Sequence, residues 1–168
     1  MSNGIAGQPA PEFRFDNWLH NPHDESAIAD IDAPIIVLYN FQAWCPGCHS
    51  HGFPALAAMR EHFQGTEYAD DVRFIVVQTV FEGYDENTED AARESVARHG
   101  LSDLALGHDA SSPPTIMADY RTGGTPWTVI IGPDRRVLAD GFQVDPEAAL
   151  HAITSILDQH AAPLGETI

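Results

Sequence analysis

The sequence predicts an α/β domain with a central mixed β-sheet flanked by helices, and three observations indicate this class. Residues 33–42 form a nearly continuous apolar run, and residues 71–81 form a second one; both are typical of strands buried on two faces. A segment with helical periodicity follows each run. The chain then closes with an alternating segment around Gly132-Pro133-Asp134 and an amphipathic helix. Strands that alternate with helices favour the α/β class.

The chain is expected to form one domain overall, with three parts. Residues 1–29 are a lead-in whose segment FRFDNWLH is expected to pair as an edge strand, residues 30–160 are the domain itself, and residues 161–168 are a C-terminal tail. The helix after the first buried strand includes Pro54, which is expected to kink it, and Gly65, which ends it.

Start and stop signals place the remaining elements. Thr88 is an N-cap candidate, and Gly100 follows the end of a helix predicted over about 88–99. Asp145 and Pro146 occupy the N-cap and first position of the last helix. Between these helices the pattern predicts a short strand in LALGHD, a short helix in PPTIMADY and a hairpin in PWTVIIGPDRRVLADGF.

The charge of the chain narrows the classes of partner. It has 25 acidic and 8 basic residues, all eight of them Arg, and a net charge of −17. Such a surface repels phosphate backbones and anionic lipids, so neither nucleic acid nor a membrane is an expected partner. The acidic residues are spread along the chain, as in a solvated surface. No apolar run approaches the roughly 18 residues of a membrane span, and the N-terminus lacks the features of a secretory signal. These features predict a cytoplasmic protein.

The stretch AWCPGCHSHGF contains both cysteines of the chain, Cys45 and Cys48. A C-x-x-C pair is compatible with a redox centre, half of a zinc site or, with His49 following, a haem attachment point. Cys45 is expected at the junction where a buried strand ends and a helix begins. At a helix N-terminus, backbone N–H groups and the helix dipole stabilise a thiolate. Pro46 suits a first helical position, and Gly47 leaves the surface open. This placement favours the redox reading over a pair of inert structural thiols.

FQAWCPGCHSHGFPAL, followed by YRTGGTPWTVIIGPDRRVLADGF, resembles the thioredoxin superfamily, and more narrowly its TlpA-like thiol-disulfide oxidoreductases. The resemblance covers roughly residues 30–160. It depends on W-C-x-x-C after an apolar strand, G-x-P before another, and a closing hairpin and helix, in this order. It implies a thioredoxin-like fold with a βα insertion, residues 101–121, before a cis-proline.

The resemblance also implies roles for individual residues. Cys45 matches the attacking cysteine and Cys48 the resolving one, so the redox-active disulfide Cys45–Cys48 would replace any bound cofactor. Pro126 matches the cis-proline. Substrate binding is expected at Trp44, Pro46, Gly47, Thr125 and Pro126. The implied activity is that of a disulfide reductase, with a protein or small-molecule disulfide as substrate and a thiol as electron donor.

One position departs from the family pattern. Members often have a buried acid or amide six residues before the first cysteine, as a proton relay, and here that residue is Tyr39. Asn40 is expected to face away because side chains alternate along a strand. The Tyr39 hydroxyl, a water molecule, Glu82 and Glu86 remain candidates for the relay. For His49, tuning of the Cys45 thiolate and a place on a polar helix face are both open.

The alternatives are weaker. A haem protein would need an exported chain and a second axial ligand. A Cys/His site for zinc or copper would use Cys45, Cys48 and His49 or His51, but structural zinc takes four ligands and the chain has no second C-x-x-C. A peroxiredoxin-like thiol peroxidase would need Thr and Pro where Gln42 and Leu38 stand. A binding module without activity would more often have lost a cysteine.

Overall fold

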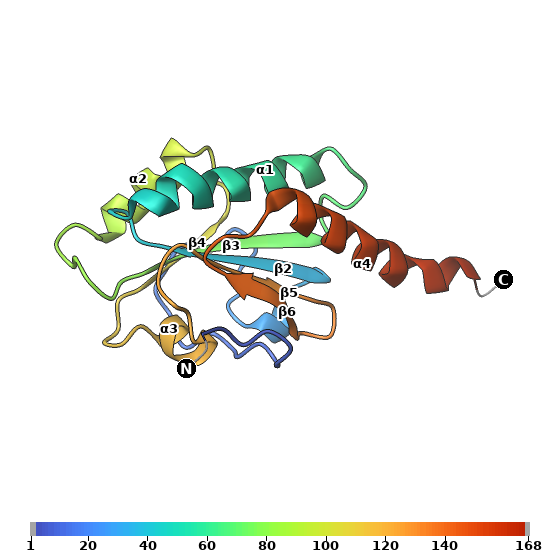
Figure 1. Ribbon diagram of the computed structural model, residues 1–168, viewed down its shortest axis with the longest axis horizontal. Helices are drawn as coiled ribbons and strands as arrows, with labels where there is room; N and C mark the ends of the chain where they lie inside the picture. Colours follow the sequence, from blue (N-terminus) through green and yellow to red (C-terminus); the bar gives the residue numbers. More distant parts are fainter. Residues whose placement is uncertain (1–2, 167–168) are drawn as a thin grey trace.

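The computed structural model describes residues 3–166, and its elements alternate as predicted (Figure 1). In chain order they are β1 (Trp18–His20), η1 (Ile28–Asp30), β2 (Ile35–Phe41), η2 (Cys48–Gly52), α1 (Phe53–Gln64), β3 (Val72–Thr79), α2 (Glu89–Arg98), β4 (Ala105–Asp109), α3 (Thr115–Tyr120), β5 (Trp127–Ile131), β6 (Val137–Gly141) and α4 (Pro146–Glu166).

Six strands form one mixed sheet in the order β1-β4-β3-β2-β5-β6. β2, β3 and β4 run parallel to one another, whereas β5 and β6 form the predicted hairpin and β5 pairs antiparallel with β2. β1 pairs antiparallel with β4 at the edge, as expected for the FRFDNWLH segment. The predicted α/β class is therefore confirmed, and the carboxyl end of β2 lies in the middle of the sheet.

The two faces of the sheet carry separate cores. Helices α1, α2 and α4 cover one face, and the N-terminal segment, η1 and α3 cover the other (Figure 1). All seven residues of β2 are buried, and alternate side chains enter the two cores. An apolar run without alternation, the signal in the sequence, is what burial on both faces requires.

The predicted helix starts are confirmed at two caps. The Thr88 hydroxyl accepts a hydrogen bond from the Ala91 N–H (3.1 Å) at the start of α2. An Asp145 carboxylate oxygen lies 3.3 Å from the Glu147 nitrogen at the start of α4. Helix α4 continues to Glu166, so most of the segment expected as a tail, 161–168, is helical.

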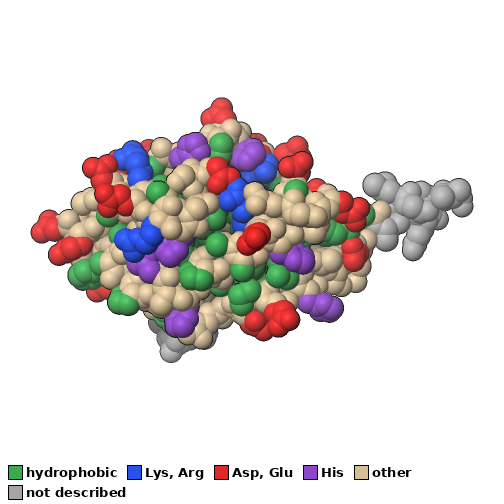
Figure 2. All heavy atoms as spheres, turned by 90° about the horizontal axis from the view of Figure 1, so that it is seen from above, with side chains coloured by type: hydrophobic (Ala, Val, Ile, Leu, Met, Phe, Trp, Pro, Cys, Tyr) green, Lys and Arg blue, Asp and Glu red, His purple; other side chains and the backbone are tan. Residues whose placement is uncertain are grey.

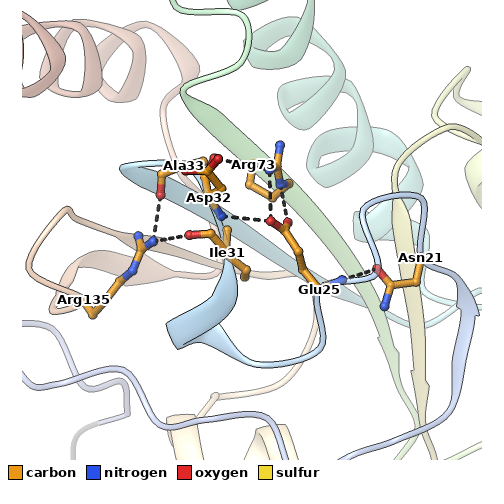
Figure 3. A network of polar contacts seen from close by, with 7 residues as sticks. All are labelled: Asn21, Glu25, Ile31, Asp32, Ala33, Arg73 and Arg135. Atoms are coloured by element: carbon orange, nitrogen blue, oxygen red, sulfur yellow. Dashed lines mark hydrogen bonds and ion pairs between the residues drawn. The ribbon is translucent and has the colours of Figure 1, made fainter.

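A polar network joins the N-terminal segment to the sheet (Figure 3). Glu25 accepts hydrogen bonds from the Arg73 guanidinium of β3 (2.7 Å) and from the Asp32 N–H (2.9 Å). Arg135, in the β5–β6 turn, donates to two carbonyl oxygens of the same segment, both at 2.8 Å. Burial alone would raise the pKa of Glu25, but these hydrogen bonds and the Arg73 charge together outweigh burial and lower it. The network fixes the lead-in against the sheet.

Acidic side chains are spread over the face of the molecule seen from the side of α1 and α2, with Arg and His side chains between them (Figure 2). This distribution agrees with the solvated acidic surface predicted from the charge. Among residues 3–166, no helix is long and apolar enough to cross a membrane.

Candidate redox site

Cys45 lies between the end of β2 and the first helical residue, Pro46. Its Sγ accepts a hydrogen bond from the Cys48 N–H (3.3 Å) and lies 3.6 Å from the carbonyl oxygen of Thr125. The side chain is partly exposed. The Cys45 sulfur is thus partly exposed at a helix N-terminus, with one backbone N–H directed at it.

Cys48 lies one helical turn further and is fully buried. Burial is the main cause that raises the pKa of this thiol to about 12, and the hydrogen bond to Cys45 and the Cys45 charge act in the same direction. The Gln42 backbone and the Thr125 side chain partly oppose the rise. Cys48 is therefore a protonated thiol near neutral pH, shielded from solvent, while Cys45 is accessible.

After Pro46 and Gly47, the helix continues as a π-helical turn, η2, that begins at Cys48. The Phe53 N–H bonds to the Cys48 carbonyl, five residues earlier, where an α-helix would use the fourth. Pro54 explains this local geometry, because proline has no N–H to donate and its ring crowds the carbonyl four residues before it. At the helix position where a kink was predicted from Pro54, the structure has a wider, π-helical turn just before the proline. That turn includes the buried thiol of Cys48.

Tyr39 supports the same turn from β2. Its buried hydroxyl donates to the Cys48 carbonyl oxygen (2.9 Å) and not to the sulfur. Burial is the main cause that raises the pKa of Tyr39, so the phenol stays protonated. Gly52 makes room for it: a Cβ there would overlap the hydroxyl and lie 2.7 and 2.8 Å from two ring carbons. Asn40 faces the other side of the sheet and bonds to the Trp127 carbonyl (3.1 Å), as the alternation predicts.

The loop before β5 closes over the C-P-G-C turn. The Thr125–Pro126 peptide bond is cis. A Cβ at Gly47 would lie 3.6 Å from Cδ of Pro126, so this ring lies directly against the turn. The structure therefore brings together four residues predicted from positions 80 residues apart in the sequence: Cys45, Gly47, Thr125 and Pro126. A second cis bond, Ser112–Pro113, lies in the insertion and is not indicated by any pattern in the sequence.

Trp44 lies on the surface beside Cys45, with 46% of its area exposed. Its ring covers Gly83, where a Cβ would lie 2.9 Å from three ring atoms. Its backbone N–H bonds to the side chain of Asn87 (3.0 Å). The Trp44 ring thus packs against Gly83, and Trp44 and the exposed Pro46 line the same hollow as Cys45.

Two buried amides that the sequence analysis missed hold this loop. Gln78 of β3 accepts from the Ala43 N–H (2.8 Å) and donates to the Thr88 carbonyl (2.9 Å). Asn87 bonds to the Trp44 N–H and donates to the Glu82 carbonyl (3.0 Å). A polar residue inside the apolar run 71–81 was the one signal available for Gln78. Buried amides of this kind are normally fully hydrogen-bonded, and these two are.

His49 supports the loop and has both ring nitrogens engaged. Nε2 lies 2.6 Å from the Ala43 carbonyl oxygen, and Nδ1 lies 3.0 Å from Nε2 of His99. The rings of His49, His99 and Phe53 stack. Burial and the neighbouring charges of His49 and Arg98 lower the pKa of His99. His49 is therefore half-buried and not on an exposed polar face of the helix, and its ring holds the backbone two residues before Cys45. Tuning of the Cys45 thiolate by His49 stays a prediction. His51 is exposed further along the turn.

A hollow of about 430 Å³ lies against Cys45, and Glu82, Phe142 and Trp44 are among its lining residues. Phe142, which follows β6, is 46% exposed and also borders a second hollow of about 620 Å³ along α1. Its place at the site is another feature that the sequence analysis missed. We call these the Cys45 hollow and the α1 hollow. Glu82 lines the Cys45 hollow, whereas Glu86 is not among its lining residues and donates its backbone N–H to the Gly83 carbonyl (3.0 Å).

The structure also describes the positions on which the peroxidase and metal-site alternatives depend. Gln42, at the position of the peroxidase threonine, is buried and shares its amide with Thr125 (3.4 Å) and the Phe81 N–H (3.3 Å). Leu38, at the position of the peroxidase proline, is fully buried in the sheet. Within the described part of the chain, no three His, Cys, Asp or Glu side chains are grouped as a metal site would need.

Comparison with known proteins gives structural relatives. No protein-family model and no curated protein sequence matches the chain. A thioredoxin-like superfamily protein of known crystal structure is 27% identical, over 90% of this chain and 97% of its own, with a TM-score of 0.74. A thiol-disulfide isomerase from Corynebacterium glutamicum is 26% identical, over 88% and 96%, with a TM-score of 0.70. A secreted disulfide oxidoreductase from Mycobacterium tuberculosis is 18% identical, over 76% and 85%, with a TM-score of 0.57.

The chain therefore has the thioredoxin-like fold, with a mixed six-stranded sheet flanked by helices. The solved structures that it resembles include thiol-disulfide oxidoreductases, and its two cysteines lie together at the position that the resemblance predicted. The narrower assignment to the TlpA-like branch stays a prediction.

Proposed function

We propose that the chain is a thiol-disulfide oxidoreductase that reduces disulfide substrates with a Cys45–Cys48 dithiol. The contrast between the two thiols is the observation that carries this proposal. Cys45 is accessible beside a helix N-terminus, whereas Cys48 is fully buried one turn away and its pKa is raised to about 12. An accessible attacker and a shielded resolver are what a dithiol cycle requires.

In the first step, the Cys45 thiolate attacks one sulfur of the substrate disulfide. The substrate S–S bond breaks, a mixed disulfide to Cys45 forms, and the second substrate sulfur leaves as a thiolate. The Cys45 sulfur accepts one hydrogen bond from the backbone N–H of Cys48. Because this donor belongs to the backbone, it is in place before substrate arrives.

In the second step, Cys48 resolves the mixed disulfide. Its proton passes to the released thiolate, and its sulfur attacks Sγ of Cys45. The Cys45–Cys48 disulfide forms and the bound substrate thiolate leaves, so two electrons have passed from the dithiol to the substrate. Once Cys45 is bonded to substrate, its charge no longer opposes ionisation of Cys48. A thiol donor then returns the protein to its reduced form.

Substrate binding is proposed at the surface formed by Trp44, Pro46, Gly47, Thr125 and Pro126. Trp44 and Pro46 are exposed on either side of Cys45. A side chain at Gly47 would begin 3.6 Å from the Pro126 ring, so glycine leaves this part of the proposed surface open. Net reduction is the direction proposed in a reducing compartment such as the cytoplasm, and a reduction potential measured against glutathione tests that direction.

Reduction of insulin with dithiothreitol as donor tests the proposal. We expect the protein to accelerate insulin precipitation well above the dithiothreitol blank, Cys45→Ser to abolish the acceleration, and its far-UV circular dichroism to match the wild type. In a reducing extract, Cys48→Ser is expected to accumulate a mixed disulfide through Cys45. Turnover at the rate of the blank by the wild-type protein would refute the proposed function.

A further inference from the structure

The Cys45 hollow has a defined charge. Of the described residues that line it, Glu82 alone is charged; the others are apolar, neutral amide or hydroxyl residues, glycines and the thiol itself. The side chain of Glu82 is exposed. A substrate disulfide that reaches Cys45 therefore encounters a hollow whose one charged lining residue, Glu82, is negative.

The segment that follows Glu82 strengthens this field. Residues 82–90 include five exposed acids and no base: Glu82, Asp85, Glu86, Glu89 and Asp90. Arg93 pairs with Glu89 and Asp90, at the end of the segment away from Glu82. The net charge of −17 adds a longer-range field of the same sign.

Buried hydrogen bonds hold Glu82 close to Cys45. Asn87 is 2% exposed and binds both the Glu82 carbonyl (3.0 Å) and the Trp44 N–H (3.0 Å). Gly83, the next residue, lies under the Trp44 ring. The Asn87 side chain thus links the backbone of Glu82 to the residue immediately before the reactive cysteine, so the backbone that carries the carboxylate is fixed beside the hollow.

The size of the surface indicates a polypeptide substrate. Phe142 lines both the Cys45 hollow, of about 430 Å³, and the α1 hollow, of about 620 Å³. A chain that presents its disulfide to Cys45 can continue past the exposed Phe142 ring into the α1 hollow. Asp145, among the residues that line the α1 hollow, adds a second carboxylate on that side.

We propose that the preferred substrates are polypeptide disulfides flanked by Arg or Lys, and that Glu82 is a specificity-determining residue. This inference rests on the proposed function, because it concerns the reaction of Cys45. Opposite charges across a binding surface speed productive encounter and suppress wrong partners. Acid-flanked cystines, and the carboxylate-bearing disulfide of glutathione, are therefore disfavoured.

Three disulfide-linked pentapeptide dimers test the preference. They differ only in the two residues beside the cysteine, which are Arg, Gln or Glu. Each kcat/KM is divided by the rate constant of the same peptide with dithiothreitol, so that differences in intrinsic reactivity cancel. At low ionic strength we expect the Arg peptide to exceed the Glu peptide by about tenfold or more. Added salt is expected to slow the Arg peptide and speed the Glu peptide, because it screens exposed charges.

Glu82→Gln and Glu61→Gln form a matched pair of variants, since each removes one exposed carboxylate and Glu61 lies in the last turns of α1. We expect Glu82→Gln to lower the Arg-to-Gln peptide ratio by roughly two- to fivefold, the worth of one exposed charge pair. Glu61→Gln is expected to leave the ratio unchanged.

Equal rates for the three peptides would overturn the inference and leave the proposed function intact. A ratio that falls equally in both variants would overturn the role of Glu82, because the net charge would then explain the preference. Failure of the Gln peptide to react faster than the dithiothreitol blank would overturn the proposed function and this inference with it.

Discussion

Substitution of Gly52 by Ala tests the support that Tyr39 gives to the turn carrying Cys48. Gly52 has helical backbone angles (φ −65°, ψ −56°), so Ala at this position would gain about 1 kcal/mol in helix propensity if space allowed. Space does not allow it, because the new Cβ would overlap the Tyr39 hydroxyl and lie 2.7 and 2.8 Å from two carbons of a fully buried ring.

The free-energy costs of Gly52→Ala are larger than its gain in helix propensity. Overpacking of a buried site costs about 1–3 kcal/mol. Displacement of the ring also breaks the hydrogen bond to the Cys48 carbonyl, worth about 1 kcal/mol. We therefore expect Gly52→Ala to lower the free energy of unfolding by about 1–3 kcal/mol, measured by urea denaturation of the reduced protein. Gly65→Ala is the control: its φ is −87°, its nearest contact would be 3.8 Å, and its effect should stay within about 0.5 kcal/mol.

A double-mutant cycle gives the sharper result. Tyr39→Phe removes the hydroxyl, and with it the closest overlap and the bond to Cys48, whereas the two ring carbons at 2.7 and 2.8 Å remain. Its effect in the Gly52→Ala background should therefore be smaller than in the wild type. The expected coupling is at least about 1 kcal/mol. Additive effects, or a Gly52→Ala variant as stable as Gly65→Ala, would show that the Tyr39–Gly52 contact does not shape the turn.

Two further predictions concern the lead-in and the substrate surface. Glu25→Gln should lower the free energy of unfolding by about 1.5–3 kcal/mol at neutral pH, because it breaks a charged hydrogen bond to Arg73. The pKa of Glu25 is lowered in the folded protein, so its contribution to stability is complete above its ordinary pKa of about 4.3 and is lost as pH falls through the folded value. A difference in unfolding free energy between wild type and Glu25→Gln that stays constant down to pH 2 would contradict this. An equal effect of Glu94→Gln, which removes an exposed carboxylate, would contradict it as well. Phe142→Ala should raise KM for insulin several-fold, roughly the loss expected from an exposed aromatic anchor, whereas Leu138→Ala, also exposed on this hairpin at 42%, should not. Equal effects of these two variants would remove Phe142 from the substrate surface.

The sequence predicts an element or a site residue correctly where the pattern that indicates it lies within a few neighbouring residues. β2 is recognisable because burial on both faces leaves a continuous apolar run, and Cys45 is recognisable because the motif follows that run directly. Thr88 and Asp145 are caps whose partners lie two or three residues away. Pro126 needed the order of motifs along the chain, since its neighbour Gly47 is far from it in sequence.

The rest depends on contacts between distant segments. Gln78 and Asn87 are polar, and a polar residue is expected at the surface unless its partners are known; here the partners are backbone groups of Ala43 and Trp44. His49 gains its place from His99, fifty residues later. The π-helical turn meets the Tyr39 hydroxyl of β2, which donates to the Cys48 carbonyl across a space left by Gly52. That contact joins segments whose pairing the local sequence does not indicate.

The central claim is that Cys45 is the attacking thiol and Cys48 the resolving thiol, and the order in which the two react with an alkylating reagent tests it most directly. Reduced protein is treated with a limiting amount of iodoacetamide at pH 7.5, and peptide mass spectrometry gives the modified fraction of each cysteine with time. Cys48 is fully buried and its pKa is raised to about 12, so modification should appear at Cys45 first and reach Cys48 only after the protein is unfolded. Modification of Cys48 before Cys45, or of both at the same rate in the folded protein, would contradict the proposed mechanism.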